Sequence, residues 1–281
     1  MKTTVRTSVL LLLCVTALSA WAAEGVAFIT NMKGDVVVDG APRPLLMSEL
    51  AKGQKIAVGR DALLSVMFIQ SGKEYLLKGP GEYAVGEREV TAGSGMPPAT
   101  RETGWRASSE VLVRVSQSSA ASIRMRSLAP PKTEEKTKLL YPTQGAISSL
   151  QPTFRWAVTD PKLTADFTLF AVGNNEEKAL SKGKSAAGSF KPATRLHPDT
   201  EYAWTIAVAG TEIGKGRFRT LPADAIQQVE KRKPAEKSDF SDRLNFALML
   251  QDLGATQEAR EAWGRLAEER ADLPELSALA K

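Results

Sequence analysis

The side chains that most often carry catalysis are sparse in this chain. His197 is the only histidine, and it stands between Leu196 and Pro198 in a predicted turn. A general base or a metal site needs a second group that orients the imidazole or completes the ligand set, and the sequence offers none. Cys14 is the only cysteine, and it falls within an apolar N-terminal stretch. We therefore expect His197 to be a surface residue and the mature chain to have no thiol chemistry.

Adjacent carboxylates occur at Glu134–Glu135, Glu176–Glu177 and Glu268–Glu269. Each pair falls in a predicted linker, turn or helix end, where neighbouring side chains point apart, whereas glycoside hydrolysis needs two carboxyl groups that converge on one bond. The glycine-rich segments 93–95 and 214–216 lack the spacing of a phosphate-binding loop, and we expect both to connect strands. No acidic run has the spacing of a calcium loop. The sequence therefore predicts a protein without catalytic residues, cofactor or metal site.

Aromatic and arginine side chains are better candidates for binding. Trp105 lies in a polar, glycine-containing stretch between Arg101 and Arg106, and its ring could stack on a sugar or a peptide. The alternative, which we favour, is that the indole closes one end of a sheet, because tryptophans are mostly buried. Arg124 and Arg126 share one predicted strand face, and guanidinium groups suit carboxylates and phosphates, although we favour a solvated face as the explanation. These five residues are the candidate ligand contacts.

The N-terminus has the pattern of a secretory signal peptide. Lys2 and Arg6 precede an apolar stretch at 9–18, and small residues flank Trp21 where a signal peptidase reads the chain. This stretch is shorter than the ~20 apolar residues that span a bilayer. We expect cleavage after Ala22, no transmembrane segment in the mature chain, and a periplasmic location, with an uncleaved anchor or secretion from the cell as alternatives.

The charge balance gives no support for binding to nucleic acid or to a membrane surface. The chain has 37 Lys and Arg against 32 Asp and Glu, and removal of Lys2 and Arg6 with the signal leaves 35 against 32. A net charge of +3 is too small to create the strong positive potential that such partners require.

Changes in composition divide the chain into modules. Residues 129–138 combine prolines and charges with no large apolar side chain, which is typical of a linker. The basic cluster Lys231–Lys233, followed by Pro234, breaks a helical pattern; we interpret it as a solvated linker rather than an interaction patch. The expected order is a signal peptide at 1–22, a β domain at 23–128, the linker at 129–138, a second β domain at 139–221 and a helical segment at 222–281.

The first β domain is predicted from short apolar strands separated by glycine turns. Residues 62–69 are apolar on both faces, as in a sheet that is covered on both sides. The alternation at 111–115 predicts a further strand near the end of this domain. This pattern indicates a β-sandwich or a barrel-like fold.

Three motifs in this domain resemble the periplasmic FecR-type domain. They are Gly34-Asp35-Val36, Leu50-x-x-Gly53-x-x-Ile56-x-Val58-Gly59 and Ala62-x-Leu64-x-Val66-x-Phe68-x-x-x-Gly72. The chain departs from the family pattern at 59–61 and at 71–73. FecR-type regulators typically carry a cytoplasmic segment and one membrane span ahead of this domain. The resemblance therefore implies, as an alternative function, sensing through a separate membrane partner.

The second β domain shows strict alternation of apolar residues from Leu196 to Val208. It resembles a fibronectin type III or immunoglobulin-like sandwich. The resemblance implies that Trp156 is a core tryptophan and that Tyr202 is the corner tyrosine of that fold. Domains of this kind serve for spacing, display or binding.

The C-terminal segment is predicted to be helical. We expect helices at 224–233, from an N-cap at Ser241 to Leu253, and from a cap at Thr256 to about Glu269. The second and third resemble a single tetratricopeptide-like hairpin in their order of small and large residues: Ala247, Leu250, Gly254, Ala259, Trp263 and Leu266. One such unit cannot bury both of its faces, so we expect it to pack on the preceding sandwich or on another chain.

The sequence as a whole predicts a mainly β fold with a C-terminal α segment, made of two β-sandwich or barrel-like modules and a helical hairpin. We expect a non-enzymatic periplasmic interaction or scaffold protein that binds an envelope protein or a glycan such as peptidoglycan or a polysaccharide. FecR-like sensing and an Asp/Glu-dependent glycan hydrolase are the alternatives.

Overall fold

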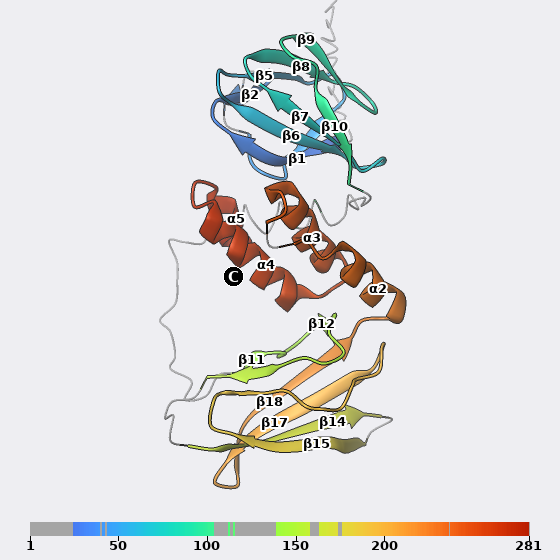
Figure 1. Ribbon diagram of the computed structural model, residues 1–281, viewed down its shortest axis with the longest axis vertical. Coiled ribbons are helices and arrows are strands. Elements are labelled where there is room, and N and C mark those ends of the chain that lie inside the picture. The colour runs from blue at the N-terminus through green and yellow to red at the C-terminus, as the bar shows by residue number, and fades with distance from the viewer. Residues whose placement is uncertain are drawn as a thin grey trace, which may run out of the picture.

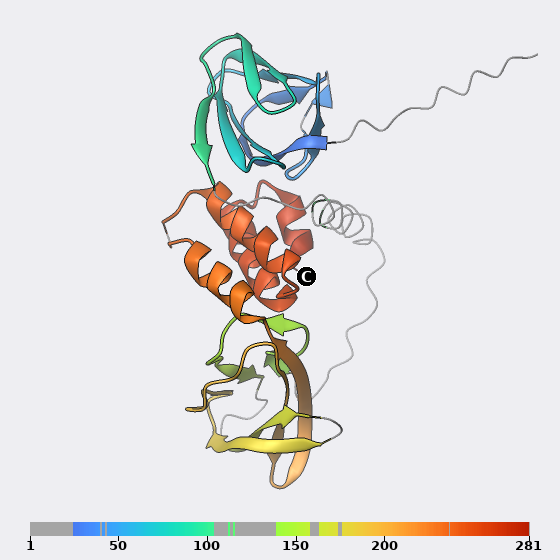
Figure 2. The same cartoon turned by 90° about the vertical axis from the view of Figure 1, so that its right-hand side faces the viewer.

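The computed structural model describes residues 25–39, 41–42, 44–103, 112, 115, 139–157, 163–173, 176–235 and 237–280. Figures 1 and 2 show three bodies in a row, with a β module at each end and the helices between them. The fold is mainly β with C-terminal helices, as the sequence predicts. The helices follow both β modules in the chain, but in space they separate them.

Within the described residues, the first module forms two five-stranded antiparallel sheets, with orders β10-β7-β6-β1-β4 and β3-β2-β5-β8-β9. The strands are β1 (Gly25–Lys33), β2 (Val36–Val38), β3 (Ala41–Pro42), β4 (Glu49–Ala51), β5 (Lys55–Val58), β6 (Leu63–Phe68), β7 (Lys73–Lys78), β8 (Gly81–Val85), β9 (Val90–Ser94) and β10 (Ala99–Glu102).

Strand β6 is buried on both faces, as its continuous apolar sequence predicts. One face meets the second sheet of the module, and the other meets the helices, where Met67 contacts Asn245. A single hydrophobic core consequently runs from the first module into the helical module, and it includes Phe28, Met67, Leu248 and Trp263. The two modules therefore form one packed unit.

The second module has its own core and its own pair of sheets, with orders β11-β13-β16 and β12-β18-β17-β14-β15 among the described residues. The strands are β11 (Leu139–Tyr141), β12 (Ala146–Ile147), β13 (Phe154–Trp156), β14 (Ala165–Val172), β15 (Glu177–Ser185), β16 (Ser189–Phe190), β17 (Glu201–Val208) and β18 (Thr211–Thr220).

Trp204 occupies the centre of this second core. Its indole N–H donates to the carbonyl of Pro142 at 2.6 Å, and its ring packs edge-on against Phe154. A Cβ atom at Gly216 would lie 2.4 Å from the indole nitrogen, so glycine makes room for the ring. The prediction that 214–216 connects strands is therefore wrong, because the segment lies inside β18. Trp156 is also buried in this core, as expected.

The helical module contains α2 (Ala223–Arg232), α3 (Phe240–Asp252), α4 (Thr256–Glu269) and α5 (Pro274–Leu279). The first three match the predicted helices to within a residue or two at their starts, but the predicted caps are wrong: Ser241 and Thr256 lie inside α3 and α4, which follow Asp239 and Ala255. Helix α5 was not predicted; Pro274 occupies its first turn, where the missing backbone N–H has no intrahelical partner to lose. None of the helices within the described residues is long and apolar enough to cross a membrane.

The strand predicted at 111–115 is wrong for the two residues that the structure describes. Leu112 and Val115 are helical, and both are buried in the core that the first module shares with the helices. Short apolar runs cannot be assigned from periodicity alone, and here β-branched valines favoured a strand. The signal peptide at 1–22 and the linker at 129–138 lie outside the described residues.

Tyr202 makes the contact expected of a corner tyrosine: its buried hydroxyl accepts the backbone N–H of His197 at 2.8 Å. We predict that Tyr202→Phe lowers the free energy of unfolding of the second module by about 1–3 kcal/mol, because that N–H loses its protein acceptor. Urea denaturation followed by tryptophan fluorescence measures this, since Trp156 and Trp204 lie in the same core. The control is Tyr75→Phe, whose hydroxyl makes only a long 3.4 Å contact with Arg88. Equal stability of Tyr202→Phe and the parent protein would contradict the assignment.

Candidate functional site at the junction of the modules

Arg101, on the edge strand β10, joins the first module to helix α3. Its Nε donates to Glu74 at 2.5 Å, and its Nη atoms pair with Asp242 and Asp239. Glu74 is 2 % exposed and also accepts the hydroxyl of Thr30 at 2.5 Å. A buried carboxylate is stable only when it is paired, so this joint fixes α3 against the sheet.

Arg270, just after α4, makes a second joint with the same module. Its guanidinium donates to the side chain of Asn31 at 2.9 Å and to the carbonyl of Met32 at 2.7 Å, and it lies over the ring of Phe240. The buried carboxylate of Glu275 accepts the backbone N–H of Leu46 at 3.0 Å.

On the opposite side, Glu258 of α4 holds the second β module. Its carboxylate accepts the hydroxyl of Tyr141 at 2.8 Å and the backbone N–H of Ser148 at 3.0 Å. Arg155 forms an ion pair with Glu261 and lies over the ring of Tyr141. Burial, together with the charge and hydrogen bond of Glu258, raises the pKa of the Tyr141 hydroxyl above its ordinary value.

A cavity of about 570 Å³, here called the junction cleft, lies between the second module and helices α2, α3 and α4. Its apolar part is formed by Pro152, Val229, Phe246, Leu250 and Leu266. The charged side chains that line it are Arg155, Lys233, Arg243, Arg265, Glu258 and Glu261.

The charges of the junction cleft differ in how strongly the protein already engages them. Both carboxylates are used in the joint with the second module, and Arg243 is paired with Glu269. Lys233 and Arg265 are exposed. An apolar floor with exposed cations at its rim has the make-up of a binding site, because the floor supplies burial and the polar groups supply orientation.

Patterns in the sequence indicated only part of this site. Of the candidate ligand contacts, Arg101 is engaged by three carboxylates, while Trp105, Arg106, Arg124 and Arg126 lie outside the described residues. The basic cluster 231–233 was the signal available in the sequence: Lys231 and Arg232 end α2, and Lys233, directly after it, lines the cleft. In the described part of the chain, no group of three His, Cys, Asp or Glu side chains is arranged to hold a metal ion.

Comparison with known proteins gives no relative: no family model matches the chain, and no curated protein matches it. The resemblances to FecR-type, fibronectin type III and tetratricopeptide domains therefore remain predictions from the sequence.

We predict that Arg101→Ala destabilises the unit formed by the first module and the helices by about 3 kcal/mol. The substitution leaves the buried Glu74 carboxylate with one hydroxyl donor, and the loss of one partner from a buried pair is costly. Urea denaturation followed by circular dichroism measures the loss. Lys73→Ala is the matched control, since its ion pair with Glu102 is exposed and should contribute less than about 1 kcal/mol. Similarly small effects of both substitutions would contradict the stabilising role of the contact between Arg101 and Glu74.

We also predict that the stability advantage of the parent protein over Tyr141→Phe decreases as pH rises above about 10, the ordinary pKa of tyrosine. Because the folded-state pKa of Tyr141 is raised, its contribution is complete below the unfolded-state pKa and is lost as pH rises toward the folded-state value. Unfolding free energies of both proteins between pH 8 and pH 11 provide the measurement. A difference that stays constant or grows with pH would show that Tyr141 titrates normally in the folded protein.

Proposed function

We propose that this protein is a non-enzymatic interaction or scaffold protein of the bacterial cell envelope, and that the junction cleft binds an envelope protein or glycan. The observation that carries the proposal is the joint construction of the cleft by the second β module and by helices packed into the first. A surface fixed in this way loses little conformational freedom on binding, which favours recognition. The envelope location rests on the signal-peptide pattern at 1–22.

The state of the acidic side chains in the cleft supports binding rather than turnover. Glu258 is hydrogen-bonded to Tyr141 and Ser148, and Glu261 is paired with Arg155. General acid–base catalysis needs carboxyl groups that face the substrate and can exchange protons with it. Carboxylates that hold two modules together are poorly placed for that role.

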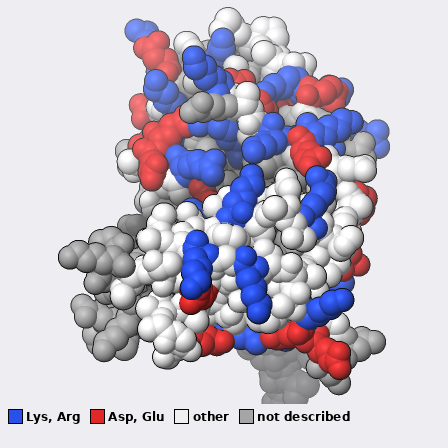
Figure 3. Space-filling model, turned by 60° about the horizontal axis from the view of Figure 1, so that its bottom comes forward, with Lys and Arg blue, Asp and Glu red and all other residues white. Residues whose placement is uncertain are grey.

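The exposed cations favour a partner that carries negative charge beside an apolar patch. Lys233 comes from the segment after α2 and Arg265 from α4, and the apolar floor includes Phe246. An acidic protein segment or a peptide-bearing, anionic glycan has this character. Lysine and arginine side chains are also spread over the end of the second module (Figure 3), so a test must separate the cleft from general surface charge.

The test compares a cleft variant with a charge-matched control. The mature chain carrying Lys233→Glu and Arg265→Glu should be retained about tenfold less than the parent by its envelope partner, equivalent to about 1.4 kcal/mol. Sedimentation with purified peptidoglycan and pull-down from envelope extracts, with the captured proteins identified, measure retention.

The control variant carries Lys178→Glu and Lys182→Glu on β15, which change the net charge equally at the far edge of the second module. It should be retained as well as the parent. An equal loss of retention in both variants would show that the interaction depends only on the overall charge of the protein surface. No specific retention of the parent in either assay would overturn the proposal.

A further inference from the structure

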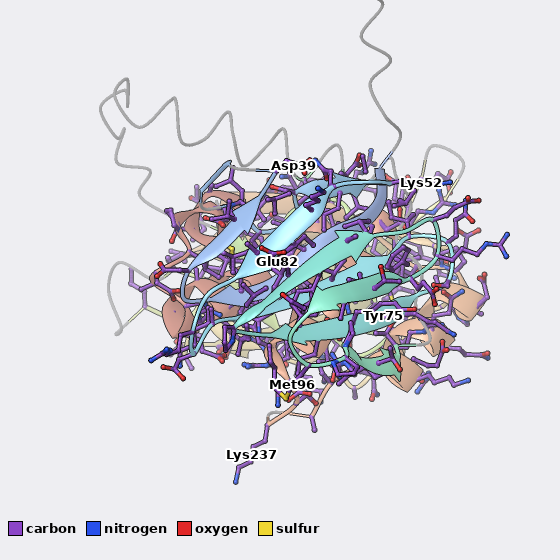
Figure 4. The ribbon with its side chains drawn as sticks, turned by 90° about the horizontal axis from the view of Figure 1, so that it is seen from above. Asp39, Lys52, Tyr75, Glu82, Met96 and Lys237 are labelled. Carbon is purple, nitrogen blue, oxygen red and sulfur yellow. The ribbon has the colours of Figure 1, made fainter. Side chains whose placement is uncertain are left out.

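A second cavity of about 470 Å³, here called the Asn245 cavity, adjoins the junction cleft and shares Lys233, Pro234 and Phe246 with it. Its walls come from Thr103 at the end of β10, from the segment that follows α2, and from α3. The connection between α2 and α3 projects from the side of the molecule, where Lys237 points away from the body (Figure 4).

Two residues that line this cavity each have one polar side-chain atom that is buried without a hydrogen-bond partner in the described part of the chain. One is Oδ1 of Asn245, a residue only 6 % exposed, whose amide nitrogen lies 3.6 Å from the sulfur of Met67. The other is Nη1 of Arg232. A buried polar atom without a partner costs about 1–3 kcal/mol, and such atoms are uncommon in native proteins. The residues that carry this acceptor and this cationic donor come from two helices and line the same cavity.

These two unpartnered atoms, Nη1 of Arg232 and Oδ1 of Asn245, determine which chemical groups a ligand would need. Arg232 needs an acceptor, and the neighbouring Lys231 and Lys233 favour a negatively charged one. The carboxylate of Asp242 offers little competition, because Arg101 already engages it. Asn245 Oδ1 needs a donor such as an amide N–H. Phe246 and Met249 give the cavity an apolar wall.

We infer that the Asn245 cavity binds the carboxyl end of a peptide. The terminal carboxylate would pair with Arg232, the last amide N–H would donate to Asn245 Oδ1, and a small apolar side chain would lie against Phe246 and Met249. The inference rests on the proposed interaction function and deepens it, because it names one kind of partner group: a free peptide carboxyl terminus, whether on a protein or on a peptide-bearing glycan.

The test uses a defined probe, N-acetyl-alanyl-alanine, and the mature full-length chain. Nuclear magnetic resonance should show shifts of the Asn245 side-chain amide, and the C-terminally amidated dipeptide should bind about tenfold more weakly, because the Arg232 pair is lost. Arg232→Lys keeps the charge but changes the donor geometry, and it should also weaken binding about tenfold.

Asn245→Leu separates binding from folding. Removal of a buried amide whose oxygen has no partner, and whose nitrogen makes only a weak contact with sulfur, should leave the melting temperature unchanged or higher, while dipeptide binding is lost. Arg260→Lys, an exposed position on α4, is the control and should bind like the parent.

Three results would overturn the inference. The first is equal binding of the free and amidated dipeptides. The second is an Asn245 amide that no probe perturbs at about 10 mM, which would assign the two polar atoms to water alone. The third is binding of glucuronate but not of the dipeptide, which would assign the cavity to sugar acids. Envelope retention through the junction cleft is measured separately, so failure of this inference is distinguishable from failure of the proposed function.

Discussion

The structure depends on covering the outer face of the sheet that contains β6. That face carries Phe28 and Met67, whose burial is favourable, together with the carboxylate of Glu74, which needs a charged partner once it is buried. The C-terminal helices cover it, so that one hydrophobic core extends from the first module through Trp263. Arg101 completes the arrangement, because it neutralises Glu74 and at the same time holds Asp242 of α3. The distant C-terminus is thereby part of the first module's stability.

The second module is attached in a different way. It keeps a separate core around Trp204 and Phe154, and it meets the helices mainly through hydrogen bonds and ion pairs to α4. The junction cleft lies at this polar joint. Its charged side chains Glu258, Glu261 and Arg155 therefore both hold the second module and line the cleft.

Local patterns in the sequence predicted most elements but not their arrangement. Alternation around Trp204 and the turn before Tyr202 specified β17 and its corner contact, and continuous apolar sequence in β6 correctly predicted burial on both faces. The sequence did not show that the C-terminal helices cover the first module, because the contacts of Arg101 with α3 join residues about 140 positions apart. For the same reason, Asn245 resembled an ordinary polar residue of a helix. Val115 was wrongly assigned to a strand because strand propensity was judged without the shared core in which this residue is buried.

In this structure the helices hold the two β modules at one fixed separation. Pulsed electron–electron spin resonance between labels at Ser94→Cys on β9 and Lys182→Cys on β15 tests it most directly, since both sites are exposed and the mature chain is expected to contain no other cysteine. We expect one narrow distance distribution that broadens when Arg101 or Glu258 is replaced by alanine. A broad distribution in the parent protein, unchanged by either replacement, would contradict it.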